Sequence, residues 1–295
     1  MAPENPLFDS EFLKKLEYLH IISKRAFSGQ FKAELRARTR GTGLEFADHR
    51  AYSPGDDFRH VDWKAYQRLN KLLLRLFEEE QDLPIFVFLD SSRSMFEGTP
   101  PRFNYAQKIA AALCYIGLAH LDRVSLFAYS DHLQKELAPQ RGKGQIFKIF
   151  KFLSELRPEG KTDAKEALTK FCTSRSSRGV AVVISDFMDP QGFTAGLNVL
   201  RHYHHEIYAL HVIGHADIPQ KIRGELKLVD SETEVTLDLE IKQSLISAYQ
   251  SELENLCNDI ASYCTKYRIG YVRTDTTVPF EEAILQVFRY GGFLK

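Results

Sequence analysis

Three oxygen-bearing side chains alternate in the short segment that follows the apolar run Phe86–Leu89. The run ends at Asp90, and Ser92 and Ser94 follow at every second position. An apolar run before a long amphipathic stretch is typical of a buried parallel strand that leads into a helix. One tight loop at the carboxyl edge of such a sheet can bring the three oxygens together, and oxygen ligands suit a hard divalent cation such as Mg²⁺. Asp and Ser are also ordinary helix caps, so the segment alone leaves both functions open.

Two later segments favour the metal site. Thr162 lies in a loop at the start of an amphipathic stretch, and the apolar run Val180–Ile184 leads through a serine to Asp186. Because the carboxyl ends of parallel strands lie on one edge of a sheet, Asp186 can reach the Asp90 loop. Asp163, next to Thr162, is better explained as a helix cap.

Together, Asp90, Ser92, Ser94, Thr162 and Asp186 resemble a complete metal-ion-dependent adhesion site of a von Willebrand factor A domain. The resemblance implies a Mg²⁺ site, with Mn²⁺ and Ca²⁺ as alternatives, and a Glu or Asp of a partner protein that completes the coordination. Only two of the five side chains carry charge, so an ion held partly through water would stay electron-poor and attract a further carboxylate. We therefore expect a binding switch and not an enzyme, without fixing which acid touches the ion.

Two other functions remain open at this site. A metal-dependent hydrolase of phosphate esters would need a second acid where Ser92 stands, because a hydroxyl cannot serve as general acid and base. The glycine-containing segment 141–144 lacks the spacing of a phosphate-binding loop. A scaffold with a vestigial metal site is the other alternative.

The elements that must position these residues alternate between strand and helix from residue 82 onward. This alternation predicts an α/β fold, a doubly wound and mostly parallel sheet covered on both faces, with an added antiparallel strand at 131–137 and a β-hairpin between 225 and 239. The predicted strands are Pro84–Asp90, Arg123–Tyr129, Val180–Asp186, Glu206–Ile213 and Arg268–Thr274, and the predicted helices are Phe103–His120, Gly144–Leu156, Ala164–Cys172, Gly192–Tyr203, Ile241–Tyr267 and Pro279–Arg289.

Residues 1–81 do not follow this alternation and are predicted to form an N-terminal module with a helix, a basic loop and some β-structure. The module carries an order of residues that resembles the bacterial family called domain of unknown function fifty-eight: Glu45-Phe46, Arg50, Tyr52, Gly55-Asp56-Asp57, Arg59 and Asp62-Trp63. The resemblance extends from about residue 41 to the C-terminus and implies a von Willebrand A-like domain at 82–295. It also implies a partnership with a MoxR-type AAA+ ATPase in chaperone-like assembly or maturation of other proteins.

Within this module, Asp56, Asp57, Arg59 and Asp62 are best explained as a turn fixed by local ion pairs, with a docking surface as the alternative. The basic stretch 36–40 is short and lacks interleaved aromatic residues, so we do not expect it to bind nucleic acid.

The bulk composition excludes several classes of protein. With 295 residues, 44% hydrophobic, 26% charged and a net charge of +0, the chain has the profile of a globular protein without a field that attracts nucleic acid or acidic membranes. Four cysteines lack zinc or redox spacing, and the histidines around 202–211 do not share one face of an element. No signal sequence or membrane span is recognisable, so a cytoplasmic protein is expected.

Overall fold

The computed structural model describes residues 7–27, 45–53, 56–78, 84–98, 100–157, 160–175, 177–189, 191–214, 224–229, 236–241 and 243–290. The chain divides into an α/β unit, Met1–Ala26 with Leu83–Lys295, and a small unit, Phe27–Asp82. The N-terminal helix belongs to the α/β unit, whereas the sequence analysis grouped it with the rest of residues 1–81.

A six-stranded sheet forms the centre of the α/β unit, with the strand order β10-β7-β6-β3-β4-β5. All neighbouring strands are parallel except β4 and β5, which pair antiparallel. The strands are β3 (Pro84–Asp90), β4 (Arg123–Tyr129), β5 (Leu133–Gln140), β6 (Val180–Ser185), β7 (Glu206–Ile213) and β10 (Gly270–Asp275). The predicted mostly parallel sheet and its antiparallel added strand are confirmed.

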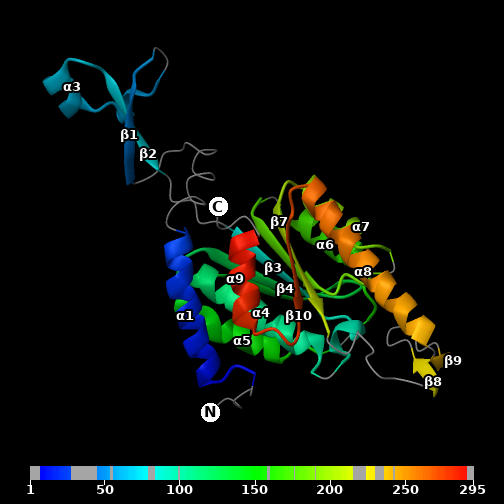
Figure 1. Cartoon of the computed structure of the whole chain (residues 1–295). Coiled ribbons are helices and arrows are strands. Elements are labelled where there is room, and N and C mark those ends of the chain that lie inside the picture. The colour runs from blue at the N-terminus through cyan, green and yellow to red at the C-terminus, as the bar shows by residue number, and fades with distance from the viewer. Residues whose placement is uncertain are drawn as a thin grey trace. The chain divides into compact units, whose positions relative to one another are not determined.

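Helices cover both faces of this sheet (Figure 1). The helices α1, α4, α5 and α9 pack against one another, for example through the rings of Phe12, Phe150 and Phe280. The helices α6, α7 and α8 contribute side chains to the core of the other face. Their bounds are α1 (Ser10–Phe27), α4 (Arg102–Ala119), α5 (Ile146–Ser154), α6 (Ala164–Ser174), α7 (Thr194–His202), α8 (Gln243–Lys266) and α9 (Phe280–Tyr290), and short 3-10 helices cover Arg93–Phe96 and Lys143–Gln145.

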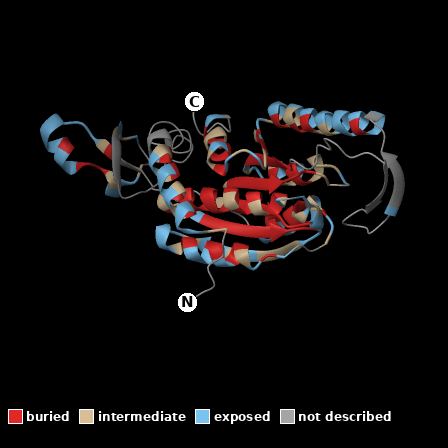
Figure 2. Ribbon diagram, turned by 60° about the horizontal axis from the view of Figure 1, so that its bottom comes forward, coloured by how far each residue is buried: buried red, intermediate tan, exposed pale blue. Residues whose placement is uncertain are grey.

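The core follows from the alternation of side chains along the central strands. Successive residues of a strand point to opposite faces of a sheet. Phe86 and Phe88 of β3 therefore share one face, where they pack with Phe127 of β4 and Phe171 of α6. Figure 2 shows the strands as the buried centre of the unit and the outer helix surfaces as exposed. β3 is apolar on both faces, as is usual for a strand covered by helices on both sides.

The C-terminal third also contains a separate two-stranded antiparallel sheet. The strands β8 (Gly224–Val229) and β9 (Thr236–Ile241) pair with each other, which confirms the predicted hairpin strands. The four cysteines are buried and form no disulfide. Among the described helices, none combines the length and the apolar character that crossing a lipid bilayer requires.

The small unit is built on an antiparallel pair of strands, β1 (Glu45–Ala51) and β2 (Leu73–Glu78). Between them lie a 3-10 helix, Phe58–His60, and the short helix α3, Trp63–Leu69. Asp62 caps α3 by accepting hydrogen bonds from the backbone amides of Lys64 and Ala65. The sequence analysis expected β-structure here but no helix. The basic stretch 36–40 lies outside the described residues.

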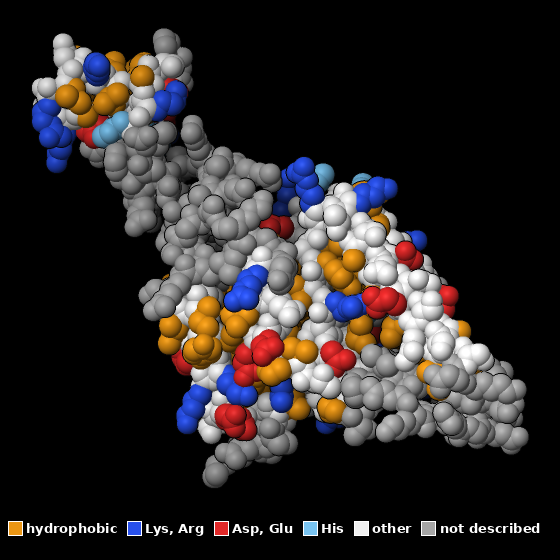
Figure 3. All heavy atoms as spheres, viewed as in Figure 1, with side chains coloured by type: hydrophobic (Ala, Val, Ile, Leu, Met, Phe, Trp, Pro, Cys, Tyr) orange, Lys and Arg blue, Asp and Glu red, His pale blue; other side chains and the backbone are white. Residues whose placement is uncertain are grey.

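Charged side chains of both signs are distributed over the surface. On the face drawn in Figure 3, Lys and Arg side chains are interspersed with Asp and Glu side chains over the described part of the α/β unit. This distribution agrees with the net charge of +0.

Candidate metal centre

The loop after β3 brings three oxygens together. Asp90 is the last residue of β3 and is fully buried. Its Oδ1 accepts a hydrogen bond from the backbone amide of Ser92 at 2.9 Å and one from the Ser92 hydroxyl at 2.6 Å. The Ser92 Oγ lies 3.1 Å from the Ser94 Oγ. The predicted convergence of these three side chains is therefore present in the fold.

The side chain between the first two members of this group points elsewhere. The Ser91 hydroxyl donates to the backbone carbonyl of Tyr129 at 3.0 Å and to Oε1 of Gln134 at 2.7 Å. Both partners come from the neighbouring β4–β5 pair. Ser91 therefore fixes the loop to the sheet and, as the alternation of side chains predicts, is not part of the oxygen group.

Thr162 lies in the loop that precedes α6 and is 5% exposed. The loop is held next to the Asp90 loop because the backbone amide of Arg93 donates to the carbonyl of Gly160 at 3.4 Å. Gly160 has a φ of +72°, a backbone conformation that favours glycine. Asp163 caps α6 by accepting from the amide of Glu166, which confirms the predicted cap.

Asp186 follows directly after β6 and is fully buried. Its Oδ1 accepts a hydrogen bond from the amide of Met188 at 3.1 Å. The preceding residue, Ser185, donates its hydroxyl to Oδ2 of Asp90 at 2.7 Å and accepts from the amide of Phe187 at 2.9 Å. The ends of β3 and β6 are thus joined by a side-chain hydrogen bond between residues that are far apart in the sequence.

A buried cation lies beside this acid. Arg102, at the start of α4, is 5% exposed. Its guanidinium approaches Oδ2 of Asp186 at 3.4 Å and donates to the backbone carbonyl of Ser94 at 2.7 Å. Neither Arg102 nor Ser185 was predicted from the sequence to belong to the site. A lone arginine at the first position of an apolar helix is the signal that could have indicated the first of them, and a hydroxyl beside a strand-end acid the second.

The two carboxylates are electrostatically unfavourable for each other. Burial, and then the charge of Asp186, raise the pKa of Asp90 from 3.8 to about 7, although hydrogen bonds from Ser92 and Ser185 act in the opposite direction. Burial disfavours the charged form of an acid, and a second negative charge adds to that effect. Positive charge placed between these groups would therefore be stabilised.

The chemistry of the donor set fits a hard divalent cation. Its members are two carboxylates and three hydroxyls, which are the oxygen ligands that Mg²⁺, Mn²⁺ and Ca²⁺ prefer. Asp90, Ser92 and Ser94 are in direct contact, and Asp186 is connected to Ser94 through Arg102. Thr162 comes to the same edge of the sheet on its own loop.

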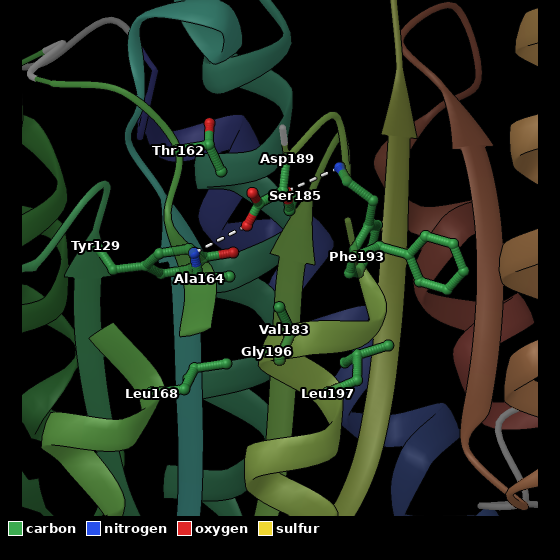
Figure 4. Close-up of a pocket in the computed structure, with 11 residues that line it drawn as sticks. Tyr129, Thr162, Ala164, Leu168, Val183, Ser185, Asp189, Phe193, Gly196 and Leu197 are labelled. Carbon is green, nitrogen blue, oxygen red and sulfur yellow. Dashed lines mark hydrogen bonds between the residues drawn. The ribbon is translucent and has the colours of Figure 1, made fainter. Parts of the chain in front are cut away.

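A narrow pocket beside these residues connects Thr162 with Ser185. Figure 4 shows the polar side chains of Thr162, Ser185 and Asp189 at one end of the pocket and the apolar Leu168 and Leu197 at the other. Asp189 closes the pocket by accepting a hydrogen bond from the amide of Ala164 at 3.0 Å. Of the five proposed ligands, Thr162 is the one that lines this pocket.

Two of the histidines considered for metal binding, His205 and His211, have structural partners. His205 packs its ring against Phe86 and Phe171, and the Nδ1 of His211 lies 2.9 Å from the hydroxyl of Tyr271. Within the described ranges, no three His, Cys, Asp or Glu side chains come together in a way that could hold a metal ion. The oxygen group at the sheet edge depends on serine and threonine and is a different kind of site.

Comparison with known proteins gives a family match and distant structural similarities. The family model described as "Protein of unknown function DUF58" matches residues 48–256, more than two thirds of the chain. Uncharacterized proteins of Mycobacterium tuberculosis and Mycobacterium bovis are each 24% identical over 242 residues, which cover 80% of this chain and 76% of the relative. None of these names assigns an activity.

Among solved structures, the hypothetical protein BatB of Bacteroides thetaiotaomicron matches 70% of this chain and 98% of its own with a TM-score of 0.46 and 15% identity. An aerotolerance-related membrane protein of Bacteroides fragilis matches 69% of this chain and 97% of its own with a TM-score of 0.45 and 16% identity.

Proposed function

This chain belongs to the DUF58 family, and we propose that its α/β unit is a von Willebrand A-like module that binds a partner protein through a divalent cation. Asp90, Ser92, Ser94, Thr162 and Asp186 would hold the ion, with Mg²⁺ as the expected occupant. When bound, the ion supplies a site for an exogenous carboxylate. The residues of this chain orient the oxygens, exclude bulk water and fix the two loops.

A single observation carries this proposal. A carboxylate and two hydroxyls converge at the carboxyl edge of a parallel sheet, with the Ser92 Oγ 2.6 Å from Asp90 Oδ1 and 3.1 Å from the Ser94 Oγ. Ligands bind at this edge in open α/β sheets. Helix capping does not explain this convergence of oxygens, because the short 3-10 helix that begins at Arg93 receives no side-chain hydrogen bond from its cap, Ser92.

The partner that we propose is a MoxR-type AAA+ ATPase presenting a Glu or Asp side chain, with this chain as its adaptor or co-factor in the assembly or maturation of other proteins. Support for this partner comes from the family resemblance alone. The interspersed surface charge supports a protein partner over a nucleic acid (Figure 3).

We propose that the site is not catalytic. Ser92 stands where a hydrolase of phosphate esters would need a second acid, and its hydroxyl is engaged with Asp90. A screen of phosphatase and nuclease substrates with wild type and Asp90→Ala tests this directly. Turnover that depends on Asp90 and needs no protein partner would replace the binding function with a hydrolase.

Titration with Mn²⁺, followed by electron paramagnetic resonance, tests the metal site itself. We expect one site per chain in the wild type and none in Asp90→Ala or Asp186→Ala. Asp163→Asn is the matched control, because Asp163 adjoins Thr162 but caps α6, a role that asparagine retains. Equal binding by wild type and Asp90→Ala would contradict the proposed ligand set. Absence of binding in the wild type would leave two alternatives: a site that only a partner's carboxylate completes, or a vestigial scaffold.

A pull-down of purified ATPase tests the partner. The complex should form with Mg²⁺, dissociate in EDTA and be absent with Asp186→Ala, while Asp163→Asn should bind as the wild type does. A complex that survives EDTA would show that the interaction does not need the ion. Circular dichroism of every variant checks that the fold is unchanged.

A further inference from the structure

Arg102 is a charged residue at the candidate metal centre that is not one of the five proposed ligands. It is 5% exposed and lies at the start of α4, a helix whose side chains are otherwise almost entirely buried apolar groups. One of its nitrogens approaches Asp186 at 3.4 Å and the other donates to the backbone carbonyl of Ser94 at 2.7 Å. Arg102 therefore contacts the Asp90 loop and the Asp186 loop at once.

Burial of an arginine is unfavourable unless its charge is compensated. Asp90 and Asp186, the two fully buried carboxylates of the site, compensate it. When both are ionised, the three side chains together carry a net charge of one negative unit. Arg102 thus does part of what a metal ion would do: it neutralises Asp186 and holds the two loops together.

The same charges set the electrostatic balance of the site once a divalent ion enters. Two carboxylates balance the ion, and the guanidinium then leaves one unit of positive charge in a buried place. A single exogenous carboxylate restores neutrality. Without the guanidinium, the ion and the two acids would already be neutral, and the site would bind the ion more tightly but have less attraction for a further anion.

We infer that Arg102 couples metal binding to carboxylate binding: it weakens the ion's affinity for the free protein and makes the loaded site select an anionic partner group. This inference rests on the proposed function and adds the residue that regulates it. Arg102 acts through charge and position and is not itself a metal ligand. Coupling of this kind is reciprocal, so the carboxylate must tighten the ion by the same factor by which the ion tightens the carboxylate.

The test measures Mn²⁺ affinity at pH 8 with and without sodium acetate, at ionic strength matched with sodium chloride, by electron paramagnetic resonance. In the wild type, acetate should tighten Mn²⁺ binding about threefold or more. In Arg102→Gln, Mn²⁺ alone should bind about tenfold more tightly, and the effect of acetate should fall towards none. Arg102→Lys keeps the charge but has a single nitrogen in place of the fork, so it should retain an acetate effect that Arg102→Gln loses.

Arg93→Gln is the matched control, because it removes the same charge from an exposed side chain of the Asp90 loop, where solvent screens it. Its metal affinity and acetate effect should equal those of the wild type. The melting temperatures of Arg102→Gln and Arg102→Lys in EDTA show whether the glutamine variant is folded. If the two are equal, a change in Mn²⁺ affinity is a change in binding and not a loss of folding.

The outcomes distinguish this inference from the proposed function. Equal or weaker Mn²⁺ binding by folded Arg102→Gln, with the acetate effect unchanged, would overturn the coupling role while leaving the metal site in place. Absence of Mn²⁺ binding in wild type and in Arg102→Gln, with and without acetate, would overturn both. Mn²⁺ binding by Arg102→Gln but not by the wild type would support the inference in its strongest form.

Discussion

Acidic residues have opposite environments in the two units of this protein. In the small unit, Asp56 and Asp57 each have a cation of their own nearby: Asp56 accepts from Arg50 at 2.8 Å, and Asp57 pairs with Arg59. At the edge of the α/β sheet, two acids are fully buried. Asp90 accepts from the hydroxyls of Ser92 and Ser185, and Asp186 lies beside Arg102. The pKa shifts follow this difference: hydrogen bonds from Arg59 lower the pKa of Asp57 to about 2, whereas burial and Asp186 raise that of Asp90 to about 7.

The acids of the small unit stabilise local turns, whereas the two buried acids at the sheet edge are placed to bind a ligand. A carboxylate at a turn is stabilised by the groups of the turn itself, and nothing else is needed to explain it. A buried carboxylate beside a second one is unfavourable in the free protein, and buried acids with raised pKa values gather at functional sites. The same residue types therefore have structural roles in one unit and indicate a binding site in the other.

The largest effect is expected for Asp90→Asn. The pKa of Asp90 is raised in the folded protein from 3.8 to about 7. The contribution of this carboxyl group to the free energy of unfolding is therefore complete below about pH 4 and is lost as pH rises through 7. In EDTA, the free energy of unfolding of the wild type should fall over this pH range. Asp90→Asn should abolish that decline and be more stable than the wild type by about 1–3 kcal/mol at pH 8. Urea unfolding at several pH values measures it.

The metal titration is the counterpart of that experiment. The more stable Asp90→Asn protein should bind no Mn²⁺, so stability and binding should change in opposite directions. A variant that is less stable than the wild type at pH 8 would mean that Asp90 is a structural acid like those of the small unit.

Ser185→Ala is expected to have the next largest effect. It removes the hydroxyl that donates to Asp90 at 2.7 Å and leaves a buried carboxylate with one donor fewer. We expect a loss of about 2 kcal/mol in the free energy of unfolding at pH 8, since hydrogen bonds to charged groups contribute about 1.5–3 kcal/mol. Ser125→Ala, at another buried serine of the same sheet, should change stability less. Equal losses in the two variants would show that the bond to Asp90 has no special weight.

Asp62→Ala tests the small unit. Asp62 caps α3 through two backbone amides and lies 2.9 Å from His49. Loss of a cap costs about 1–2 kcal/mol of local stability. Hydrogen exchange should accelerate at the amides of Lys64 and Ala65, while exchange in α6 and the affinity for Mn²⁺ stay unchanged. Altered metal binding would mean that this acid is more than a cap.

Asp57→Asn should have the smallest effect. Its carboxylate is exposed, and its lowered pKa means that the stabilising contribution is present above about pH 4 and is lost as pH falls through about 2. Salt screens an exposed pair of this kind. Thermal unfolding at pH 7 and about 0.15 M salt should not distinguish this variant from the wild type, and a clear loss would point to a contact beyond Arg59.

Sequence periodicity was sufficient to predict the α/β unit because its elements have strong and regular signals. β3, β4 and β7 are apolar runs bounded by turns, and their observed bounds equal the predicted ones. β10 begins two residues later than predicted, at Gly270, because the left-handed Arg268 lies in the turn that follows α8. The helix α3 was missed because seven residues are too few for a periodic pattern.

The residues of the oxygen group could be predicted from the sequence, but not the contacts that Ser185 and Arg102 make with them. Asp90, Ser92 and Ser94 are close in sequence, and strand topology places Thr162 and Asp186 on the same edge. Their ligation of a metal stays a prediction. The hydrogen bond from Ser185 and the contact of Arg102 with Asp186 depend on which way each side chain turns across the edge, and no pattern in the sequence encodes that.

The bond between Ser185 and Asp90 joins positions separated by 95 residues. While the protein is being synthesised, β3 emerges long before β6, so the first three oxygens are made well before Thr162, Asp186 and the strand that supports them. Loop closure over that distance must precede any high-affinity metal binding. A growing chain that ends before about residue 190 cannot complete the proposed site. Metal loading would therefore report that the central strands have assembled, and a truncated chain would be recognisable by its failure to retain the ion.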